Sequence, residues 1–320
     1  MEPAVAEWFA RRSSRAADWP ASMLQAAKGS TTVSVVLPAL DEASTVGDIV
    51  DVVRRDLVDV SEPLVDELVV LDSGSTDATA RVAAEAGARV VHRDDVLPDV
   101  PSVAGKGEAL WRSLAATSGD VVVFIDADLI EFRSTFVTGL LGPLLTDPSV
   151  QLVKAMYDRP LTDGSVVHPA GGGRVTELVA RPLLNLHWPQ LAGFVQPLAG
   201  EYAAHRRLLE RLPFATGYGV EIALLIDALG EVGLDALAQV DLGERRHRHH
   251  SDLRLGRMAA EIWQTALARL HQDGELQTVE PTLTQFERAA STYLPVTHDV
   301  TALERPPMLG VRGDKRLPGR

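Results

Sequence analysis

Asp126 and Asp128 are two carboxylates separated by one residue, and they directly follow the apolar run 121–125. Mg²⁺ and Mn²⁺ prefer oxygen ligands, and proteins commonly hold them with one or two carboxylates plus the phosphates of a substrate. An acidic turn has the same composition, so the place of the pair at the end of a buried strand is what favours function. We expect one carboxylate to bind a divalent cation and the other to meet a ribose or a water.

A second polar segment, 72–77, follows another apolar run. Ser75 or Asp77 can cap the helix predicted after it, and capping alone is one interpretation. The other interpretation is that Asp72 and Ser73 contact the base or ribose of a nucleotide at the edge of a sheet.

Two basic residues stand beside glycines. Lys106 is flanked by glycines at the start of a predicted helix, where exposed amides and the helix dipole favour anions. Arg174 follows the glycines 171–173, whose amides can approach a ligand, and its guanidinium can grip a phosphate or carboxylate. The alternatives are an ordinary solvated lysine and a flexible glycine linker.

Glu221 and the segment 245–250 complete the candidate residues. Glu221 opens an apolar helix, where it either orients a sugar hydroxyl or complements the helix dipole. The segment 245–250 reads Arg-Arg-His-Arg-His-His and is the densest cationic cluster of the chain. A neutral imidazole there suits Mn²⁺, and the arginines suit an anionic substrate. The alternative is a solvated charged face.

The elements that must position these residues alternate through the first half of the chain. Apolar runs predict strands, and helical periodicity predicts the helices between them, so we expect βαβ units and a mostly parallel sheet. Ligands of such sheets bind beyond the carboxyl ends of the strands, where the polar motifs 38–42, 72–77 and 126–128 fall. The predicted strands are 33–37, 68–71, 88–92 and 121–125, and the predicted helices are 45–58, 78–86 and 105–116.

The pattern changes after about residue 150. We expect a strand at 151–157, a loop at 161–173, a short strand at 240–242, and helices at 174–186, 218–228 and 255–270. The predicted division is a peripheral N-terminal segment 1–30, a nucleotide-binding subdomain 31–160, a second subdomain 161–272 and a partly mobile C-terminal extension 273–320.

Composition excludes several classes of protein. The 320 residues are 46% hydrophobic, contain no cysteine and carry a formal net charge of −13. So acidic a chain is a poor candidate for nucleic-acid binding, and the lack of cysteine fits a cytoplasmic location. No apolar run approaches the roughly 18 residues of a membrane span, and the N-terminus lacks the pattern of a signal peptide.

Together these motifs resemble those of GT-A glycosyltransferases: a strand and Pro-Ala-Leu-Asp-Glu, a strand and Asp-Ser-Gly-Ser-Thr-Asp, then a strand and Asp-x-Asp. The second half narrows the resemblance to actinobacterial glucosyl-3-phosphoglycerate synthases, a family of retaining enzymes. The similarity runs from about 33 to 250 and includes GKGEALWRSL, GGGRVTELVARPLL, QPLAGEYA, GYGVEI and AQVDLGERRHRH.

The resemblance implies a GT-A fold, UDP-glucose as donor and Mg²⁺ or Mn²⁺ as cofactor. Asp128 and His247 would hold the metal, and Glu221, Asp128 and Lys106 would take part in catalysis. The implied donor-binding residues are Pro38, Ala39, Leu40, Asp41, Glu42, Ser73, Lys106, Asp126, Ala127, Tyr218, Gly219, Val220 and Glu221.

The same resemblance implies 3-phosphoglycerate as acceptor, glucosylated at its 2-hydroxyl. The implied acceptor-binding residues are Gly173, Arg174, Val175, Thr176, Arg245 and His249. The family pattern has Asn where this chain has His249, and an imidazole can still donate a hydrogen bond to a phosphate. The family also implies a homodimer, for which the helix 255–270 offers an apolar face, although a core-facing helix has the same pattern.

Four other functions remain as alternatives. A mannosyl-3-phosphoglycerate synthase shares the fold and acceptor and uses GDP-mannose. A sugar-nucleotide nucleotidyltransferase requires a glycine-rich phosphate loop after the first strand, which 38–42 is not. A lipid-linked-sugar transferase lacks support because no membrane segment follows. A sugar-nucleotide sensor without turnover is disfavoured by the presence of both Asp128 and His247.

Overall fold

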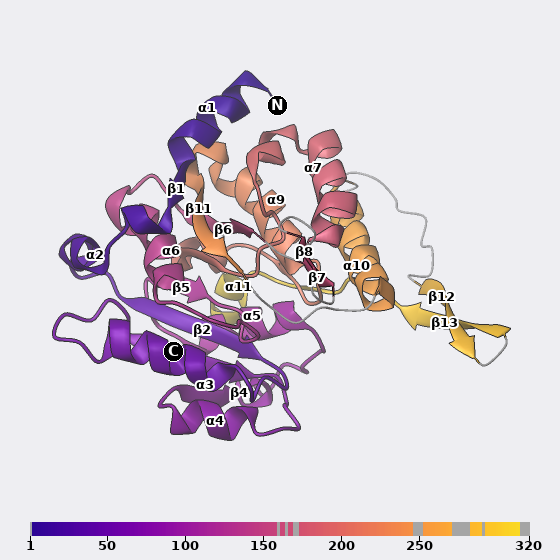
Figure 1. Ribbon diagram of the computed structural model, residues 1–320, viewed down its shortest axis with the longest axis horizontal. Coiled ribbons are helices and arrows are strands. Elements are labelled where there is room, and N and C mark those ends of the chain that lie inside the picture. The colour runs from indigo at the N-terminus through magenta and orange to yellow at the C-terminus, as the bar shows by residue number, and fades with distance from the viewer. Residues whose placement is uncertain are drawn as a thin grey trace, which may run out of the picture.

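The computed structural model describes residues 2–158, 161–163, 166–168, 173–245, 252–270, 282–289 and 292–313. Within this part of the chain, eight strands form one sheet (Figure 1). In spatial order they are β1 (Ser13–Arg15), β11 (Leu237–Glu244), β6 (Leu152–Asp158), β9 (Tyr202–His205), β5 (Val121–Phe124), β2 (Val33–Ala39), β3 (Glu67–Asp72) and β4 (Arg89–His92).

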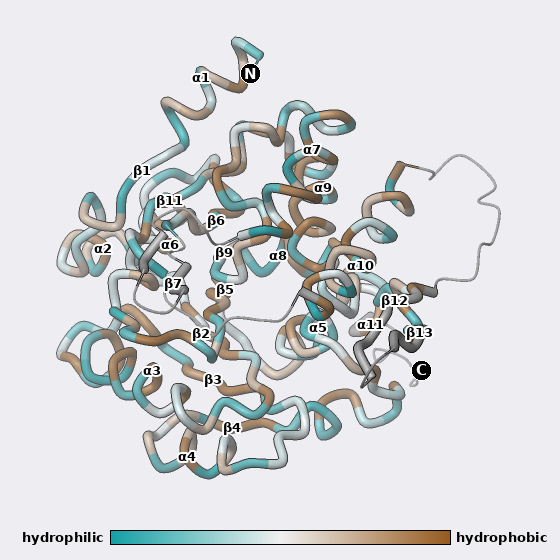
Figure 2. The backbone as a smooth tube through the Cα atoms, turned by 45° about the vertical axis from the view of Figure 1, so that its right-hand side comes forward, coloured by the Kyte–Doolittle hydropathy of each residue, from teal (hydrophilic) through white to brown (hydrophobic). Residues whose placement is uncertain are grey.

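The sheet is mixed and mostly parallel. Strand β9 runs antiparallel to both of its neighbours, β5 and β6, whereas the other neighbouring pairs are parallel. The central strands β2 and β3 are buried along most of their length, in keeping with their mostly apolar sequences (Figure 2). The predicted α/β class with a mostly parallel sheet is confirmed.

Helices cover both faces of the sheet and pack apolar residues against it. The core of one face includes Leu24, Ile49, Ala83 and Leu140, which come from α2 (Ala21–Lys28), α3 (Val46–Val53), α4 (Thr79–Glu85) and α6 (Thr135–Thr146). The other face is covered by α1 (Pro3–Arg12), α5 (Lys106–Ala116), α7 (Arg181–His187), α8 (Arg206–Leu209), α9 (Val220–Val232), α10 (Asp252–Leu270) and α11 (Met308–Gly313).

The predicted strands and helices are confirmed, with ends shifted by a few residues. Strand β2 continues through Pro38 to Ala39, two residues beyond the predicted end at 37. The expected loop 161–173 is wrong in part, because β7 (Leu161–Asp163) and β8 (Val166–His168) form a hairpin there. Further strands that the sequence analysis missed are β1, β9, β10 (Phe214–Ala215), β12 (Thr282–Ala289), β13 (Thr292–Asp299) and β14 (Glu304–Arg305).

The sheet continues across the boundaries expected near residues 30 and 160. Strand β1 of the N-terminal segment pairs with β11, and β9 and β11 of the second half lie in the same sheet as β2 and β5. The N-terminal segment is also packed into the core, since Trp8 is buried and its indole N–H donates to the Leu237 carbonyl at 2.9 Å.

The C-terminal segment returns to the body of the molecule. Strands β12 and β13 form a hairpin that projects from the body near α10 (Figure 1), and β14 then pairs with β10. No helix in the described ranges is both long enough and apolar enough to cross a membrane.

Candidate active site

A cavity of about 590 Å³ lies beyond the carboxyl ends of β2, β3 and β5. Its lining combines both halves of the chain. From the first half come Pro38, Ala39, Leu40, Glu42, Ser73, Arg93, Ala104, Gly105, Lys106, Ala109, Asp126, Ala127 and Asp128; from the second come Gly173, Arg174, Val175, Thr176, Leu198, Gly200, Tyr218, Glu221, Arg245, Arg254, Leu255, Met258 and Ile262.

Lys106 joins two carboxylates at the centre of this lining. Its ammonium group contacts the Asp126 carboxylate and lies 2.9 Å from Glu221 Oε1, although the three residues come from α5, the end of β5 and α9. Burial opposes the charged lysine, but the two carboxylates more than compensate and hold the pKa of Lys106 well above its ordinary value. Lys106 is therefore a fixed cation facing the cavity.

Arg245 holds the second cationic position. Its guanidinium lies 2.8 Å from Asp126 Oδ2, 3.2 Å from Asp128 Oδ1 and 2.8 Å from Glu201 Oε1. Burial opposes its charge, and the surrounding acidic groups raise the pKa of Arg245 well above its ordinary value. We call the linked residues Lys106, Asp126, Asp128, Glu201, Glu221 and Arg245 the site cluster.

The first turn of α5 is fitted closely against the chain before α9. Gly105 has φ +125°, and neither it nor Gly107 has room for a Cβ beside the backbone of residues 215 and 216. The Glu108 amide donates to the Thr216 carbonyl at 3.2 Å. These contacts bring Lys106 and Glu221 together although they lie far apart in sequence.

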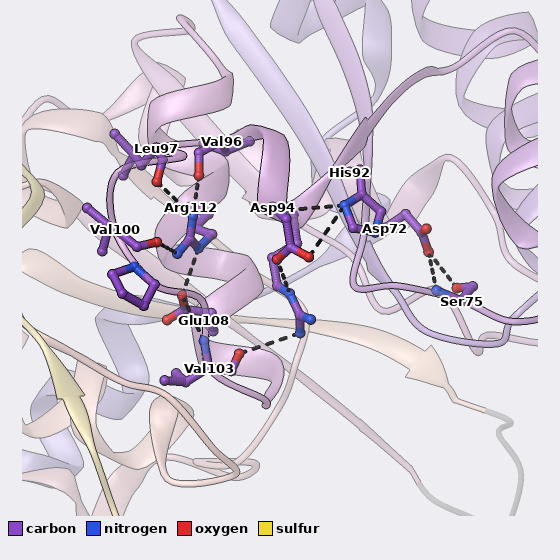
Figure 3. Close-up of polar contacts among 12 residues, drawn as sticks. Asp72, Ser75, His92, Asp94, Val96, Leu97, Val100, Val103, Glu108 and Arg112 are labelled. Atoms are coloured by element: carbon purple, nitrogen blue, oxygen red, sulfur yellow. Dashed lines mark hydrogen bonds and ion pairs between the residues drawn. The ribbon is translucent and has the colours of Figure 1, made fainter.

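The far side of the same turn carries a different set of charges. Glu108 is fully buried and bonds Arg112 at 2.7 Å and Arg305 at 2.7 Å, and we call these three residues the scaffold cluster. Arg112 also donates to the carbonyls of Val96, Leu97 and Val100 (Figure 3). The scaffold cluster thus fastens the loop that precedes Lys106.

Most of the first-half residues predicted to contact the nucleotide line the cavity, and Asp41 and Asp72 do not. Pro38, Ala39, Leu40, Glu42 and Ser73 line the cavity. The expected residues that do not line it are Asp41, which has φ +58° and accepts a hydrogen bond from the Thr76 amide at 2.8 Å, and Asp72, which accepts from the Ser75 amide at 3.1 Å (Figure 3). Asp41 and Asp72 brace the turn after β3.

The predicted acceptor loop also reaches the cavity. Gly173 has φ +77° and leads into a helical stretch made of η4 (Thr176–Ala180) and α7; Val175 and Thr176 are buried in its first turn. At the start of α9, Tyr218 and Glu221 line the cavity. Gly219 and Val220 do not: Val220 is buried in the core, and Gly219 packs against the Thr265 side chain.

Several lining residues escaped the sequence analysis. Arg93 follows β4, so the strand-end rule that selected Ser73 could have found it. Arg254, Leu255, Met258 and Ile262 belong to α10, whose periodicity shows an apolar face without showing that the face borders a cavity. Leu198 and Gly200 come from QPLAGEYA, which gave no chemical signal of its own.

The described residues supply some of the ligands that a divalent cation would need. Asp128 presents carboxylate oxygens to the cavity, and these are suitable ligands for Mg²⁺ or Mn²⁺. Within the described ranges no three His, Cys, Asp or Glu residues form a ligand cluster. His247 and His249 lie outside the described residues, so a cation there would rely on Asp128, substrate phosphates and residues beyond the described set.

Comparison with known proteins agrees with this geometry. Residues 34–169 match the model of glycosyl transferase family 2. A glucosyl-3-phosphoglycerate synthase of Mycobacterium tuberculosis is 53% identical over 92% of this chain and 90% of its own length. This chain belongs to the glucosyl-3-phosphoglycerate synthase family. A synthase of this family from Petrotoga mobilis is 42% identical over 89% of this chain and 88% of its own.

Solved structures of the family share the fold. A crystal structure of the M. tuberculosis synthase with Mn²⁺, UDP and phosphoglyceric acid superposes with a TM-score of 0.81 at 51% identity, over 92% of this chain and 96% of that one. Another, with Mg²⁺ and UDP, has a TM-score of 0.83 at 50% identity, over 94% and 99%. The predicted GT-A fold is thereby confirmed.

Proposed function

We propose that this chain transfers glucose from UDP-glucose to the 2-hydroxyl of 3-phosphoglycerate with retention of anomeric configuration. The observation that carries the proposal is one cavity lined both by the Lys106–Asp126–Glu221 group and by Gly173–Thr176. A synthase of the same family, 51% identical, has been solved with Mn²⁺, UDP-glucose and phosphoglyceric acid.

The donor lies along the strand ends. The uridine side of the cavity is lined by Pro38, Ala39, Leu40, Glu42 and Ser73, and Lys106 faces the diphosphate. Asp128 and His247 would hold Mg²⁺ or Mn²⁺, which supplies positive charge for the leaving diphosphate. Since Lys106 is held charged by Asp126 and Glu221, it stabilises the negative charge that develops on UDP without reorganising.

The acceptor lies against the loop 173–176. Arg174 provides a guanidinium for the phosphate or carboxylate of 3-phosphoglycerate, and the loop orients its hydroxyl toward the glucose. Arg245 has a different place in this proposal. Because three carboxylates bind its guanidinium, it organises the site cluster in the described state, and its contact with the acceptor is secondary.

Retention proceeds without an evident carboxylate nucleophile. Glu221 is the carboxylate at the glucose side, but its Oε1 lies 2.9 Å from the Lys106 ammonium group and is held by it. We therefore propose front-face attack by the acceptor hydroxyl, with Glu221 orienting glucose hydroxyls beside Tyr218.

Three further assignments belong to this proposal. Residues 31–160 supply most of the donor site and 161–272 most of the acceptor site. A cytoplasmic location fits the absence of cysteine and the two metabolites used. A homodimer is proposed from the exposed Trp263 and Leu253 on α10, since Ile262 and Ala266 of the same helix are buried in its own core; light scattering on the purified protein tests it.

The experiment is product identification. The protein is incubated with Mg²⁺, 3-phosphoglycerate and either UDP-glucose or GDP-mannose, and the product is examined by mass spectrometry and NMR. An α-glucoside at O2 of 3-phosphoglycerate is the expected result. A β-glucoside would contradict retention, a mannoside would replace the donor assignment, and no glycoside from either donor would overturn the proposal.

A further inference from the structure

Lys154 of β6 is a buried lysine that the proposed reaction does not use. Its ammonium group donates to the Ala199 carbonyl at 2.5 Å and lies 4.8 Å from the centroid of the Tyr202 ring. Taking an ammonium group out of water costs several kcal/mol, whereas an apolar side chain of similar length fills the same space without that cost. At 2% exposure, packing alone does not account for a lysine here.

The sheet register places Lys154 beneath the site cluster. Lys154 pairs with Tyr202 of β9, and Tyr202 pairs with Phe124 of β5, with their rings 4.9 Å apart. Phe124 is the last residue of β5, two before Asp126, and both rings are buried on the face of the sheet that α5 and its Lys106 cover. The lysine therefore lies on the face of the sheet from which Asp126 reaches Lys106.

The carbonyl that Lys154 holds belongs to the turn 196–200. The Ala199 amide donates to the Gln196 carbonyl at 3.0 Å, which closes this turn. Gly200 has no room for a Cβ because the Asp126 carboxylate and the Lys106 ammonium group occupy that space. The turn is thus packed directly against the Lys106–Asp126 pair.

Lys154 is also within electrostatic reach of the carboxylates. Burial lowers its pKa to about 8. The Lys106 charge adds to this lowering, and it is opposed by Glu221 of α9, Glu201 just before β9 and Asp126 just after β5. The site cluster contains four carboxylates and two cations, so Lys154 reduces its excess negative charge from two to one.

We propose that Lys154 is a positioning residue for glucosyl transfer, which anchors the turn 196–200 against the Lys106–Asp126 pair and offsets the carboxylates of the site cluster. The kinetic part of this inference rests on the proposed function. Its effect on cation binding does not, because that effect is measured without either substrate.

The test uses two substitutions and a matched control. Lys154→Met removes the charge and the hydrogen bond, whereas Lys154→Gln removes the charge and keeps a donor for the Ala199 carbonyl. Tyr202→Phe is the control, because Tyr202 of β9 is the residue paired with Lys154 in the sheet. The hydroxyl that it removes is buried and has no hydrogen-bond partner among the described residues, and the ring beside Lys154 stays.

Two kinds of measurement are made. The first gives the steady-state kinetic parameters for both substrates. We expect Lys154→Met to lower kcat/KM for UDP-glucose by about ten-fold or more, with the KM for 3-phosphoglycerate changed by less than about two-fold. Lys154→Gln is expected to lie between wild type and Lys154→Met, and Tyr202→Phe to match wild type.

The second quantity is the affinity for Mn²⁺ alone, from the electron paramagnetic resonance signal of the free ion. Without the Lys154 charge, the carboxylates attract the cation more strongly, so we expect both Lys154 variants to bind Mn²⁺ about three-fold tighter. General loosening of the site would weaken Mn²⁺ binding instead.

Either of two results overturns the proposal: wild-type kinetics in Lys154→Met, or Mn²⁺ binding that is unchanged or weaker in both variants. If wild type itself fails to form the glucoside, the proposed function fails, and the Mn²⁺ titration still decides the role of Lys154.

Discussion

Lys106 and Glu108 are two residues apart at the start of α5, yet they belong to two charged clusters that differ in their access to the cavity. The site cluster around Lys106 borders a cavity of about 590 Å³, and the side chains of Asp126 and Asp128 remain 18% and 25% exposed. The scaffold cluster around Glu108 is closed, since Glu108 and Arg112 are fully buried and surrounded by one another, by Arg305 and by backbone carbonyls.

The two clusters differ in whether their charged groups can still bind a ligand. Glu108 and Arg112 of the scaffold cluster are fully buried and bonded to protein groups, so that cluster stabilises a loop and a helix. The site cluster keeps its charges at a surface that anions and cations can reach, and a charge held in advance there is useful for transfer chemistry. Chemical composition alone does not separate the two clusters; their access to the cavity does.

Removal of Asp128, the carboxylate that we propose binds the metal, should have the largest effect. We expect Asp128→Ala to lower kcat by about 100-fold or more, because the charge on the leaving diphosphate loses its counterion. UDP binding should also lose its dependence on Mg²⁺, as measured by calorimetry with and without the metal. Wild-type turnover in this variant, with an unchanged melting temperature, would refute the role given to Asp128.

Breaking the scaffold cluster should reduce stability more than chemistry. Glu108→Gln leaves Arg112 and Arg305 without their buried carboxylate, so we expect the free energy of unfolding to fall by about 3 kcal/mol. Urea denaturation measures this loss, and the kcat of the folded variant should stay within a few-fold of wild type. A large fall in kcat at unchanged stability would contradict the purely structural role given to the scaffold cluster.

Loss of Arg174, which we propose binds the acceptor, should affect the KM of one substrate more than that of the other. Arg174→Ala removes a charged hydrogen bond worth about 1.5–3 kcal/mol, which should appear in the KM for 3-phosphoglycerate. Initial rates at varied concentrations of each substrate measure the split. An equal rise in the KM for UDP-glucose would place Arg174 outside the acceptor site.

The smallest expected effect is a dependence of stability on pH through Lys154. Burial lowers its pKa in the folded protein to about 8, so above that pH the unfolded chain binds more protons than the folded one. The stability of wild type relative to Lys154→Met should therefore rise by about 1 kcal/mol from about pH 8 to about pH 9. Denaturation curves of both proteins at these pH values test it, and a flat or falling difference would show that the pKa of Lys154 is not lowered to about 8 in the folded state.

The features predicted correctly from the sequence are those that depend on local pattern. Apolar runs and helical periodicity located the parallel strands, and the strand-end rule then placed Ser73, Asp126 and Asp128 at one edge. Glycines on both sides of Lys106 indicated an anion site at a helix start, and Lys106 does line the cavity.

What the sequence missed depends on contacts between distant segments. Arg245 stands in a basic run typical of an anion site, but it is bound by the carboxylates of Asp126, just after β5, and Glu201, just before β9. Arg305 meets Glu108 across 197 residues, and no local pattern signals that pair. Val220 shares a motif with Glu221, yet it lies on the core side of α9 because the two side chains point in different directions around the helix.

The most direct measurement of the central claim is the initial rate of nucleotide release by the purified protein with Mg²⁺. UDP-glucose and GDP-mannose are compared, each with and without 3-phosphoglycerate. The account predicts rapid UDP release that requires 3-phosphoglycerate and is absent in Asp128→Ala. Release that ignores the acceptor, or that occurs from GDP-mannose in preference to UDP-glucose, would contradict it.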